Sequence, residues 1–224
     1  MNALKLELPV APDLRVSALA TQAPEVQACY VLAHGAGAGM EHPFMTQVAE
    51  GLAQRRIATL RYQFPSMESG KRRPDSPAVA HATVRAAVAL AASHFGPLPL
   101  FAGGKSFGGR MTSQAQALEP MEGVSGLIFL GFPLHPPGKP SITRAAHLAD
   151  IDVPMLFVHG TRDKLAEPTP FQSAISSRLP LATVIEVAEA DHSFHVPMRS
   201  GRRDSEVLDD LLDSLAAWTQ ALRP

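Results

Sequence analysis

Apolar and polar residues alternate in two short segments near the start of the chain, residues 4–8 and residues 14–19. Such alternation is typical of a strand that buries one face, because successive side chains point to opposite faces of a sheet. The two segments lie close enough along the chain to pair with each other. We therefore predict an antiparallel hairpin at one edge of a sheet.

Further along the chain the alternation gives way to nearly continuous apolar runs. Runs of this kind are typical of strands that are buried on both faces, as in a parallel sheet. They cover residues 29–33, 57–62, 98–102, 127–130, 155–158 and 183–187.

Helical periodicity appears between these runs. Over residues 76–95 the apolar positions are spaced by three or four, and Gly96 follows as a stop signal. Residues 204–222 repeat the rhythm, with Asp204 or Ser205 as the predicted N-terminal cap. Strands that alternate with helices predict an α/β fold, in which helices cover both faces of a mostly parallel central sheet.

Length and composition are consistent with one domain over residues 1–224. The chain has 224 residues, of which 46% are hydrophobic and 18% are charged, enough to bury a sizeable core. Residues 132–140 contain four prolines and are predicted to form a loop. Only 24 residues separate the run at 127–130 from the run at 155–158, so we expect no large lid.

The formal net charge of −1 gives the chain as a whole no attraction to nucleic acid or to anionic lipid, and we expect neither as a partner. Cys29 is the only cysteine, so no internal disulfide is possible, and its apolar surroundings predict a small core residue. The apolar pattern shows neither a leader peptide nor a membrane span, which favours a cytoplasmic protein. No spacing typical of a metal or cofactor site is present.

Residues 103–110 read GGKSFGGR and contain the pattern G-x-S-x-G around Ser106. The pattern follows a predicted buried strand and precedes a predicted helix over residues 107–118, which is the context of a nucleophile elbow. The glycines at −2 and +2 are expected because larger side chains there would collide with the neighbouring strand and helix. The N–H of Phe107, at the helix start, is the first predicted donor to an oxyanion.

Two nucleotide-binding motifs resemble parts of this sequence, and both fail. The G-K-S at 104–106 would end a phosphate-binding loop only with a glycine five positions earlier, where Pro99 stands. The glycines at 35–39 would match a dinucleotide fingerprint only with a third glycine at the position of Met40 or His42. A nucleotide-binding protein is therefore excluded.

A serine nucleophile needs a base, and the base needs a carboxylate to orient it. In the elbow fold the order along the chain is serine, acid, histidine, each after the carboxyl end of a strand. Asp163 follows the run at 155–158, and His192 follows the run at 183–187. We predict that Ser106 is the nucleophile, His192 the base and Asp163 the carboxylate.

Other residues near these positions remain as alternatives. His195 is the alternative base, because a helical segment would bring it to the same cleft as His192. Glu167 and Glu189 are weaker substitutes for Asp163, and Asp191 is expected to be a structural carboxylate or cap.

The small residues of the loop 34–39, which reads HGAGAG, would let its backbone approach a substrate closely. The N–H of Ala36 is the predicted second donor of the oxyanion hole, with Gly37 as the alternative. His34 is expected to bond to loop backbone rather than to take part in chemistry.

On the segments HGAGAG, GKSFGGR, HGTRD and DHSF, the chain resembles the α/β-hydrolase superfamily over nearly its whole length. It looks like the small lidless group related to dienelactone hydrolases, and more narrowly like the branch with a G-K-S-x-G-G-R elbow. That branch includes a testis-expressed hydrolase-like protein and a chromatin-complex subunit. Dienelactone hydrolases themselves use cysteine where this chain has Ser106.

The resemblance implies a serine hydrolase that forms an acyl-enzyme with a small ester, thioester or amide as its small-molecule acyl substrate. The alternative is a non-catalytic binding or scaffold protein of the same fold. Lys105 and Arg110 match the branch motif; a cation there would hold the elbow or favour an acidic substrate. The basic clusters at 71–73 and 199–203 are expected to be solvated loop charge, with anion binding as the alternative.

Overall fold

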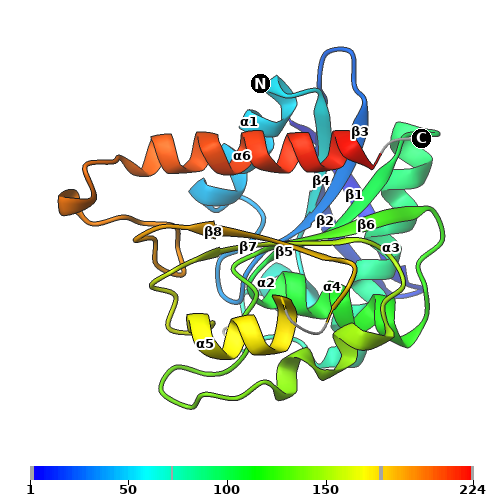
Figure 1. Ribbon diagram of the computed structural model, residues 1–224. Coiled ribbons are helices and arrows are strands. Elements are labelled where there is room, and N and C mark those ends of the chain that lie inside the picture. Colours follow the sequence, from blue (N-terminus) through cyan, green and yellow to red (C-terminus); the bar gives the residue numbers. More distant parts are fainter. Residues whose placement is uncertain (1–2, 72, 177–178, 223–224) are drawn as a thin grey trace.

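The computed structural model describes residues 3–71, 73–176 and 179–222. Its centre is an eight-stranded sheet in the order β1-β2-β4-β3-β5-β6-β7-β8 (Figure 1). The strands are β1 Leu4–Ala11, β2 Leu14–Thr21, β3 Ala28–Ala33, β4 Ile57–Tyr62, β5 Leu100–Lys105, β6 Val124–Leu130, β7 Met155–Gly160 and β8 Ala182–Val187.

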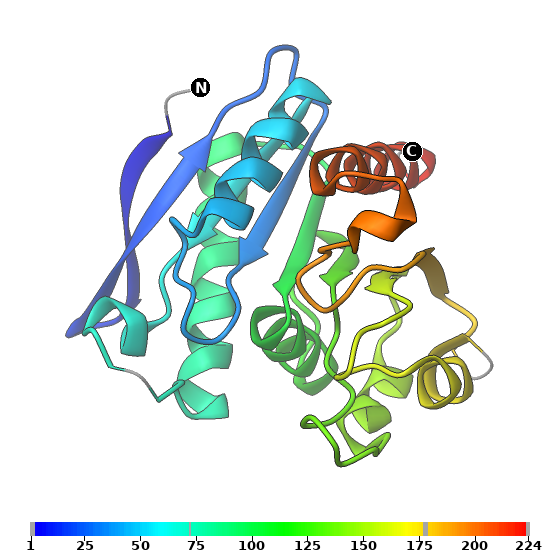
Figure 2. The ribbon, with the colours of Figure 1, turned by 90° about the vertical axis from the view of Figure 1, so that its left-hand side faces the viewer.

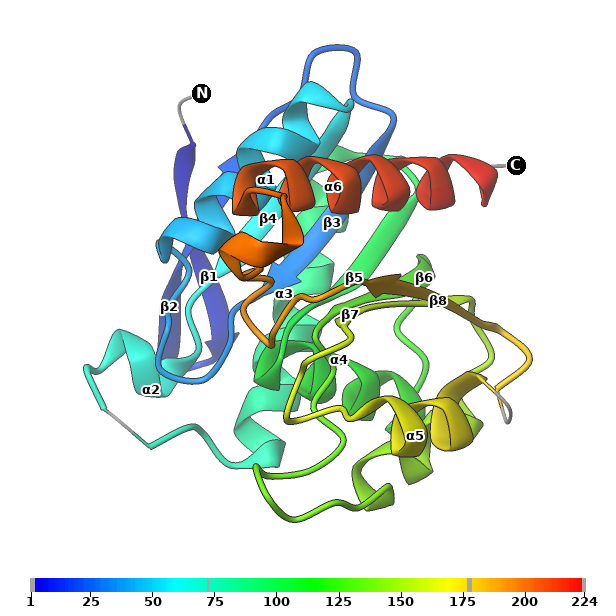
Figure 3. The same ribbon diagram turned by 60° about the vertical axis from the view of Figure 1, so that its left-hand side comes forward.

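The N-terminal hairpin is the antiparallel part of the sheet. β1 pairs with β2, and β2 pairs with β4, both antiparallel, whereas every pairing from β4 to β8 is parallel. Figure 3 shows the hairpin at one end of the sheet and β8 at the other. The α/β fold and the edge hairpin predicted from the hydrophobic pattern are both confirmed.

Helices cover both faces of the sheet. Figure 1 shows α1 and α6 on one side and α4 and α5 on the other, and α3 packs with α4. A four-residue helix, α2, lies between β4 and α3. The α-helices are α1 Pro43–Gln54, α2 Pro65–Glu68, α3 Pro77–Phe95, α4 Phe107–Leu118, α5 Pro168–Phe171 and α6 Asp204–Ala221. Two 3-10 helices, η1 Thr143–Asp150 and η3 Met198–Ser200, and one π-helix, η2 Gln172–Ser176, complete the described helices.

The central strand β3 explains why its apolar run has no polar gaps. Cys29 and Val31 face the core beneath α3 and α4, while Tyr30 and Leu32 face the core beneath α1 and α6. Both faces are therefore dry, and each position must be apolar. Cys29 is fully buried, as expected for a core residue.

Two local predictions are corrected. β5 begins at Leu100 rather than at residue 98, because Pro99 has no N–H to donate to a neighbouring strand. The N-cap of α6 is Arg203, whose N–H donates to the Glu206 carboxylate at 2.9 Å. Asp204 does not cap the helix, because its carboxylate accepts from the Val196 N–H at 3.0 Å instead.

The connection between β6 and β7 contains no lid domain. Residues 131–154 hold only the turn η1 and a proline-rich loop. Within the described parts of the chain, no helix is both long and apolar enough to cross a membrane.

The strand order places a crevice at the carboxyl end of β3 and β5. The chain leaves β3 for β4 on one side and later returns to β5 on the other side, so connections run away from this point in opposite directions. Ligands of open α/β sheets bind at such switch points. Figure 2 shows the segment after β8, in orange, reaching the end of β5 there.

Candidate active site

Ser106 occupies the turn between β5 and α4 in a strained conformation. Its backbone angles are φ 51° and ψ −113°. This positive φ is uncommon for a residue with a side chain and marks a sharp strand-to-helix turn. The turn lifts the serine side chain out of the sheet at the crevice.

The glycines on either side of Ser106 are required by close backbone contacts. A Cβ on Gly104 would lie 2.2 Å from the Ala33 carbonyl oxygen, and one on Gly108 would lie 2.6 Å from the His34 carbonyl oxygen. The expected collisions at both positions therefore come from β3 and the loop that follows it.

Ser106, His192 and Asp163 form a continuous hydrogen-bonded chain. The Ser106 Oγ lies 2.9 Å from His192 Nε2, and His192 Nδ1 lies 2.7 Å from Asp163 Oδ2. Because an ionised carboxylate can only accept, Nδ1 carries the proton and Nε2 is free to accept from the serine hydroxyl. The structure thus brings together the three residues predicted from the order of strands.

Asp163 is held as a charged carboxylate although it is buried. Burial by itself would raise its pKa, but the hydrogen bonds from His192 and from the Leu165 N–H, with the nearby charge of Lys105, bring the pKa below its usual value. Both carboxylate oxygens have a donor, which fixes the side chain against the imidazole.

The alternative residues lie elsewhere. The segment at residues 191–195 forms turns rather than a helix, and His195 is exposed and bonds to Asp204 at 2.8 Å. Glu189 pairs with Arg199 on the surface, and Glu167 lies at the start of α5. Asp191 has the structural role expected of it, because its carboxylate accepts from two N–H groups of its own turn.

The loop after β3 faces the elbow and presents backbone donors. Ala36, Gly37 and Phe107 line one small pocket of about 10 Å³, room for about one water-sized group. Among the described residues, no acceptor pairs with the N–H of Ala36 or of Phe107. This is the arrangement that an oxyanion hole requires.

His34 supports this loop. Its Nδ1 donates to the Gly35 carbonyl at 2.8 Å, and its Nε2 accepts from the Phe64 N–H at 3.1 Å. Burial lowers its pKa, which keeps the ring neutral in this pair of bonds. The expectation that His34 bonds to loop backbone is confirmed.

Lys105 connects the elbow to the base. Its Nζ donates to the backbone carbonyl of His192 and lies 5.2 Å from the ring centroid of Phe194 and 6.0 Å from that of Phe44. A Cβ on Gly131 would lie 2.8 Å from this Nζ, so the glycine makes room for the ammonium group. The sequence signalled Lys105 only as part of a motif and gave no sign of its two aromatic neighbours.

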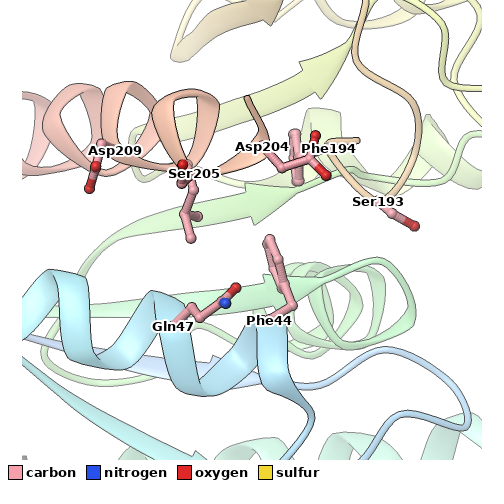
Figure 4. A pocket seen from close by; sticks show the side chains of 8 residues that line it. Phe44, Gln47, Ser193, Phe194, Asp204, Ser205 and Asp209 are labelled. Carbon is pink, nitrogen blue, oxygen red and sulfur yellow. The ribbon is translucent and has the colours of Figure 1, made fainter. Parts of the chain in front are cut away.

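The two aromatic rings also close one end of a groove between α1 and α6. Phe44 and Phe194 stack with centroids 5.8 Å apart, and Figure 4 shows them facing each other from opposite sides. The groove measures about 410 Å³ and continues past Ser205 and Asp209 of α6. Ser193 and Phe194, which follow His192 in the chain, line this groove, whereas Ser106 is not among its lining residues.

The basic clusters differ in their surroundings. Arg199, Arg202 and Arg203 each pair with a carboxylate, as expected of solvated loop charge. Arg72 lies outside the described residues. Its neighbours Lys71 and Arg73 line pockets beside Phe107, near the elbow.

The eight-stranded sheet, the lidless crevice and the strained serine turn define the α/β-hydrolase class. A family model described as "Alpha/beta hydrolase domain" matches residues 26–220, and the chain belongs to this family. The narrower resemblance to the branch with the G-K-S-x-G-G-R elbow stays a prediction.

Solved structures with the same fold match nearly the whole chain. XC6422 from Xanthomonas campestris, described as an α/β serine hydrolase without a lid, has 19% identity and a TM-score of 0.76 over 97% of this chain and 95% of its own. Dienelactone hydrolase from Anabaena variabilis has 18% identity and a TM-score of 0.75 over 98% and 97%. Est1E from Butyrivibrio proteoclasticus has 18% identity and a TM-score of 0.68 over 96% and 100%. At these identities the likeness establishes the fold.

Proposed function

We propose that the protein is a serine hydrolase that cleaves a small ester, thioester or amide through an acyl-enzyme intermediate. The observation that carries the proposal is the hydrogen-bonded chain from Ser106 through His192 to Asp163, with distances of 2.9 and 2.7 Å. Membership of the α/β-hydrolase family and the lidless serine hydrolase XC6422 support the same reaction class.

In the first step the Ser106 Oγ attacks the substrate carbonyl carbon while its proton passes to His192 Nε2. The carbonyl electron pair moves to oxygen, where the N–H groups of Ala36 and Phe107 would donate to it. Each such donor commonly lowers the barrier by about 3 kcal/mol. His192 then gives the proton to the leaving group, whose bond to the carbonyl carbon breaks.

In the second half His192 takes a proton from water, and the hydroxide attacks the acyl-enzyme. Collapse of this intermediate releases the acid and returns the proton to Ser106. Asp163 stays ionised throughout and stabilises the imidazolium each time it forms. The pocket of about 10 Å³ beside Ala36 and Phe107 favours a small group at that position.

The test is labelling with a fluorophosphonate probe, which reacts with activated serines. We expect stoichiometric labelling of the wild-type protein at Ser106, located by mass spectrometry, and loss of labelling in Ser106→Ala and His192→Ala. Ser193→Ala is the matched control, because Ser193 adjoins the base but is exposed and borders the groove of Figure 4 rather than the crevice. This control should label like the wild type.

A protein that is folded by circular dichroism and takes no label would contradict the proposal. That result would favour the alternative, a non-catalytic protein of the same fold that binds a ligand or a partner. A labelled protein would next be given 4-nitrophenyl esters of increasing acyl length, and the dependence of the rate on chain length would measure the size of the acyl site.

A further inference from the structure

Most arginine side chains in the described residues have a hydrogen-bond or ion-pair partner. Three lack one within the described ranges: Arg73, Arg110 and Arg144. The nine that have one are Arg15, Arg55, Arg56, Arg61, Arg85, Arg162, Arg199, Arg202 and Arg203.

The three unpaired arginines lie in one region beside the elbow. Arg73 and Arg110 line a groove of about 480 Å³, and the charge of Arg144 acts on Arg110. Phe107 and Pro74 line both this groove and the pocket that contains Ala36. The groove therefore begins next to the proposed oxyanion hole.

Of the three arginines, Arg110 is the one whose side chain has a buried polar atom without a partner among the described residues. It stands in the first turn of α4, where its N–H donates to the Ser106 carbonyl, and its guanidinium carbon lies 5.8 Å from the ring centroid of Phe107. Its Nε is buried, and no acceptor among the described residues bonds to it. A buried donor without a partner is uncommon in folded proteins and favours an acceptor that arrives with a ligand.

Arg110 has no ion-pair partner among the described residues, and the causes that lower its pKa are burial and the charge of Arg144. Asp75 is the one acidic residue among the described residues that line the groove, and its carboxylate accepts from the Ser66 N–H at 2.9 Å. His147 has its pKa lowered to about 4, first by burial and then by the charge of Arg110. Arg73, Arg110 and the nearby Arg144 thus outnumber the single carboxylate of the groove, Asp75.

We propose that Arg110, supported by Arg73 and Arg144, forms a subsite for an anionic group of the substrate, a carboxylate or a phosphate. Guanidinium groups bind both anions through paired N–H donors. The inference rests on the proposed function, because the anionic group would belong to the same molecule whose carbonyl is attacked by Ser106. It narrows the substrate to an acyl compound with a negative charge near the reacting carbonyl.

The kinetic test compares neutral and anionic esters. Phenyl acetate is paired with 3-acetoxybenzoate and with 3-acetoxyphenyl phosphate, and 4-nitrophenyl butyrate is paired with 4-nitrophenyl hydrogen glutarate. In Arg110→Gln the ratio of anionic to neutral kcat/KM should fall roughly tenfold or more, as expected for a lost charge-assisted hydrogen bond. Arg199→Gln is the matched control; it removes the same charge from a paired, exposed site outside the groove and should leave the ratio unchanged.

A binding test separates the subsite from the reaction. Calorimetry of glutarate and of inorganic phosphate with Ser106→Ala, with and without Arg110→Gln, needs no turnover. Saturable binding that Arg110→Gln abolishes supports the subsite even if fluorophosphonate labelling fails, and the preferred anion distinguishes carboxylate from phosphate. Equal rate ratios in the wild type and Arg110→Gln, together with no such binding, would overturn the subsite while hydrolysis of neutral esters left the proposed function standing.

Discussion

The two cations of the elbow motif, Lys105 and Arg110, stand five positions apart and differ in whether their side chains have a hydrogen-bond acceptor. Lys105 donates to the His192 carbonyl, lies over two aromatic rings and is attracted by Asp163 and Asp191. Arg110 also lies near an aromatic ring, that of Phe107, but its buried Nε has no acceptor among the described residues and another arginine is nearby.

The difference teaches how to assign a role to a charge near a candidate nucleophile. A cation that already donates to an acceptor of its own protein is part of the framework, because a ligand would have to replace that hydrogen bond. A cation with a buried donor and no acceptor can still bind a ligand. On this basis we assign Lys105 to positioning the proposed base, His192, and Arg110 to binding the proposed anionic group of the substrate.

The largest predicted effect concerns Asp163, the carboxylate that is hydrogen-bonded to the proposed base His192. Asp163→Asn should reduce kcat by roughly a thousandfold to ten-thousandfold, because the amide no longer fixes the tautomer or stabilises the imidazolium. Glu189→Gln is the control, since this carboxylate is exposed and pairs only with surface arginines. Steady-state rates of ester hydrolysis measure both. Comparable losses in the two variants would remove Asp163 from its proposed role.

A smaller effect should come from Lys105→Met. The change leaves the His192 carbonyl without its donor and removes a positive charge near Asp163. We expect kcat to fall about tenfold with little change in KM, in line with the loss of one charged hydrogen bond. The rate of fluorophosphonate labelling should fall in parallel.

The control for that variant is Lys139→Met, which changes an exposed lysine in the proline-rich loop. If Lys105→Met labelled and turned over like Lys139→Met, the ammonium group would not position the base, and the contrast with Arg110 would disappear.

The pH dependence of stability sharpens the contrast further. Burial lowers the pKa of Lys105 from its usual 10.5 to about 8, against the opposing attraction of Asp163 and Asp191. Between these two values the unfolded chain binds more protons than the folded protein, so this residue makes the free energy of unfolding rise with pH. Urea titrations at pH 7.5 and 9.5 should show wild type gaining stability relative to Lys105→Met. A constant difference would mean that Lys105 titrates normally.

The smallest effect is expected for His195→Ala. His195 is exposed, and the hydrogen bond and charge of Asp204 raise its pKa. The interaction of His195 with Asp204 therefore stabilises the folded protein below the usual pKa of histidine. This stabilisation is lost as the pH rises through the pKa that His195 has in the folded protein. Activity should stay within about twofold of wild type, and melting temperature should fall slightly more at pH 5.5 than at pH 8.5. A large loss of activity would restore His195 as the base.

The hydrophobic pattern predicted every strand of the sheet to within a few residues. A strand that is buried on both faces needs apolar residues throughout, and such a run can be recognised in the sequence without knowing which strands lie beside it. The N-cap of α6, Arg203, was missed because capping depends on which partners the fold supplies. Asp204 is a residue type that often caps helices. In the folded chain, however, its carboxylate is hydrogen-bonded to the Val196 N–H and to the His195 ring.

By itself the sequence determined the α/β layering, the serine turn with its glycines, and the candidate residues Ser106, Asp163 and His192. These follow from periodicity and from the order of strands, which are properties of short stretches of chain. Tertiary structure alone decided which of the nearby charges are satisfied. Lys105 meets its acceptor 87 positions further along the chain, and Arg110 meets none among the described residues. Electrostatic partners are chosen by distance in space, and only folding sets that distance.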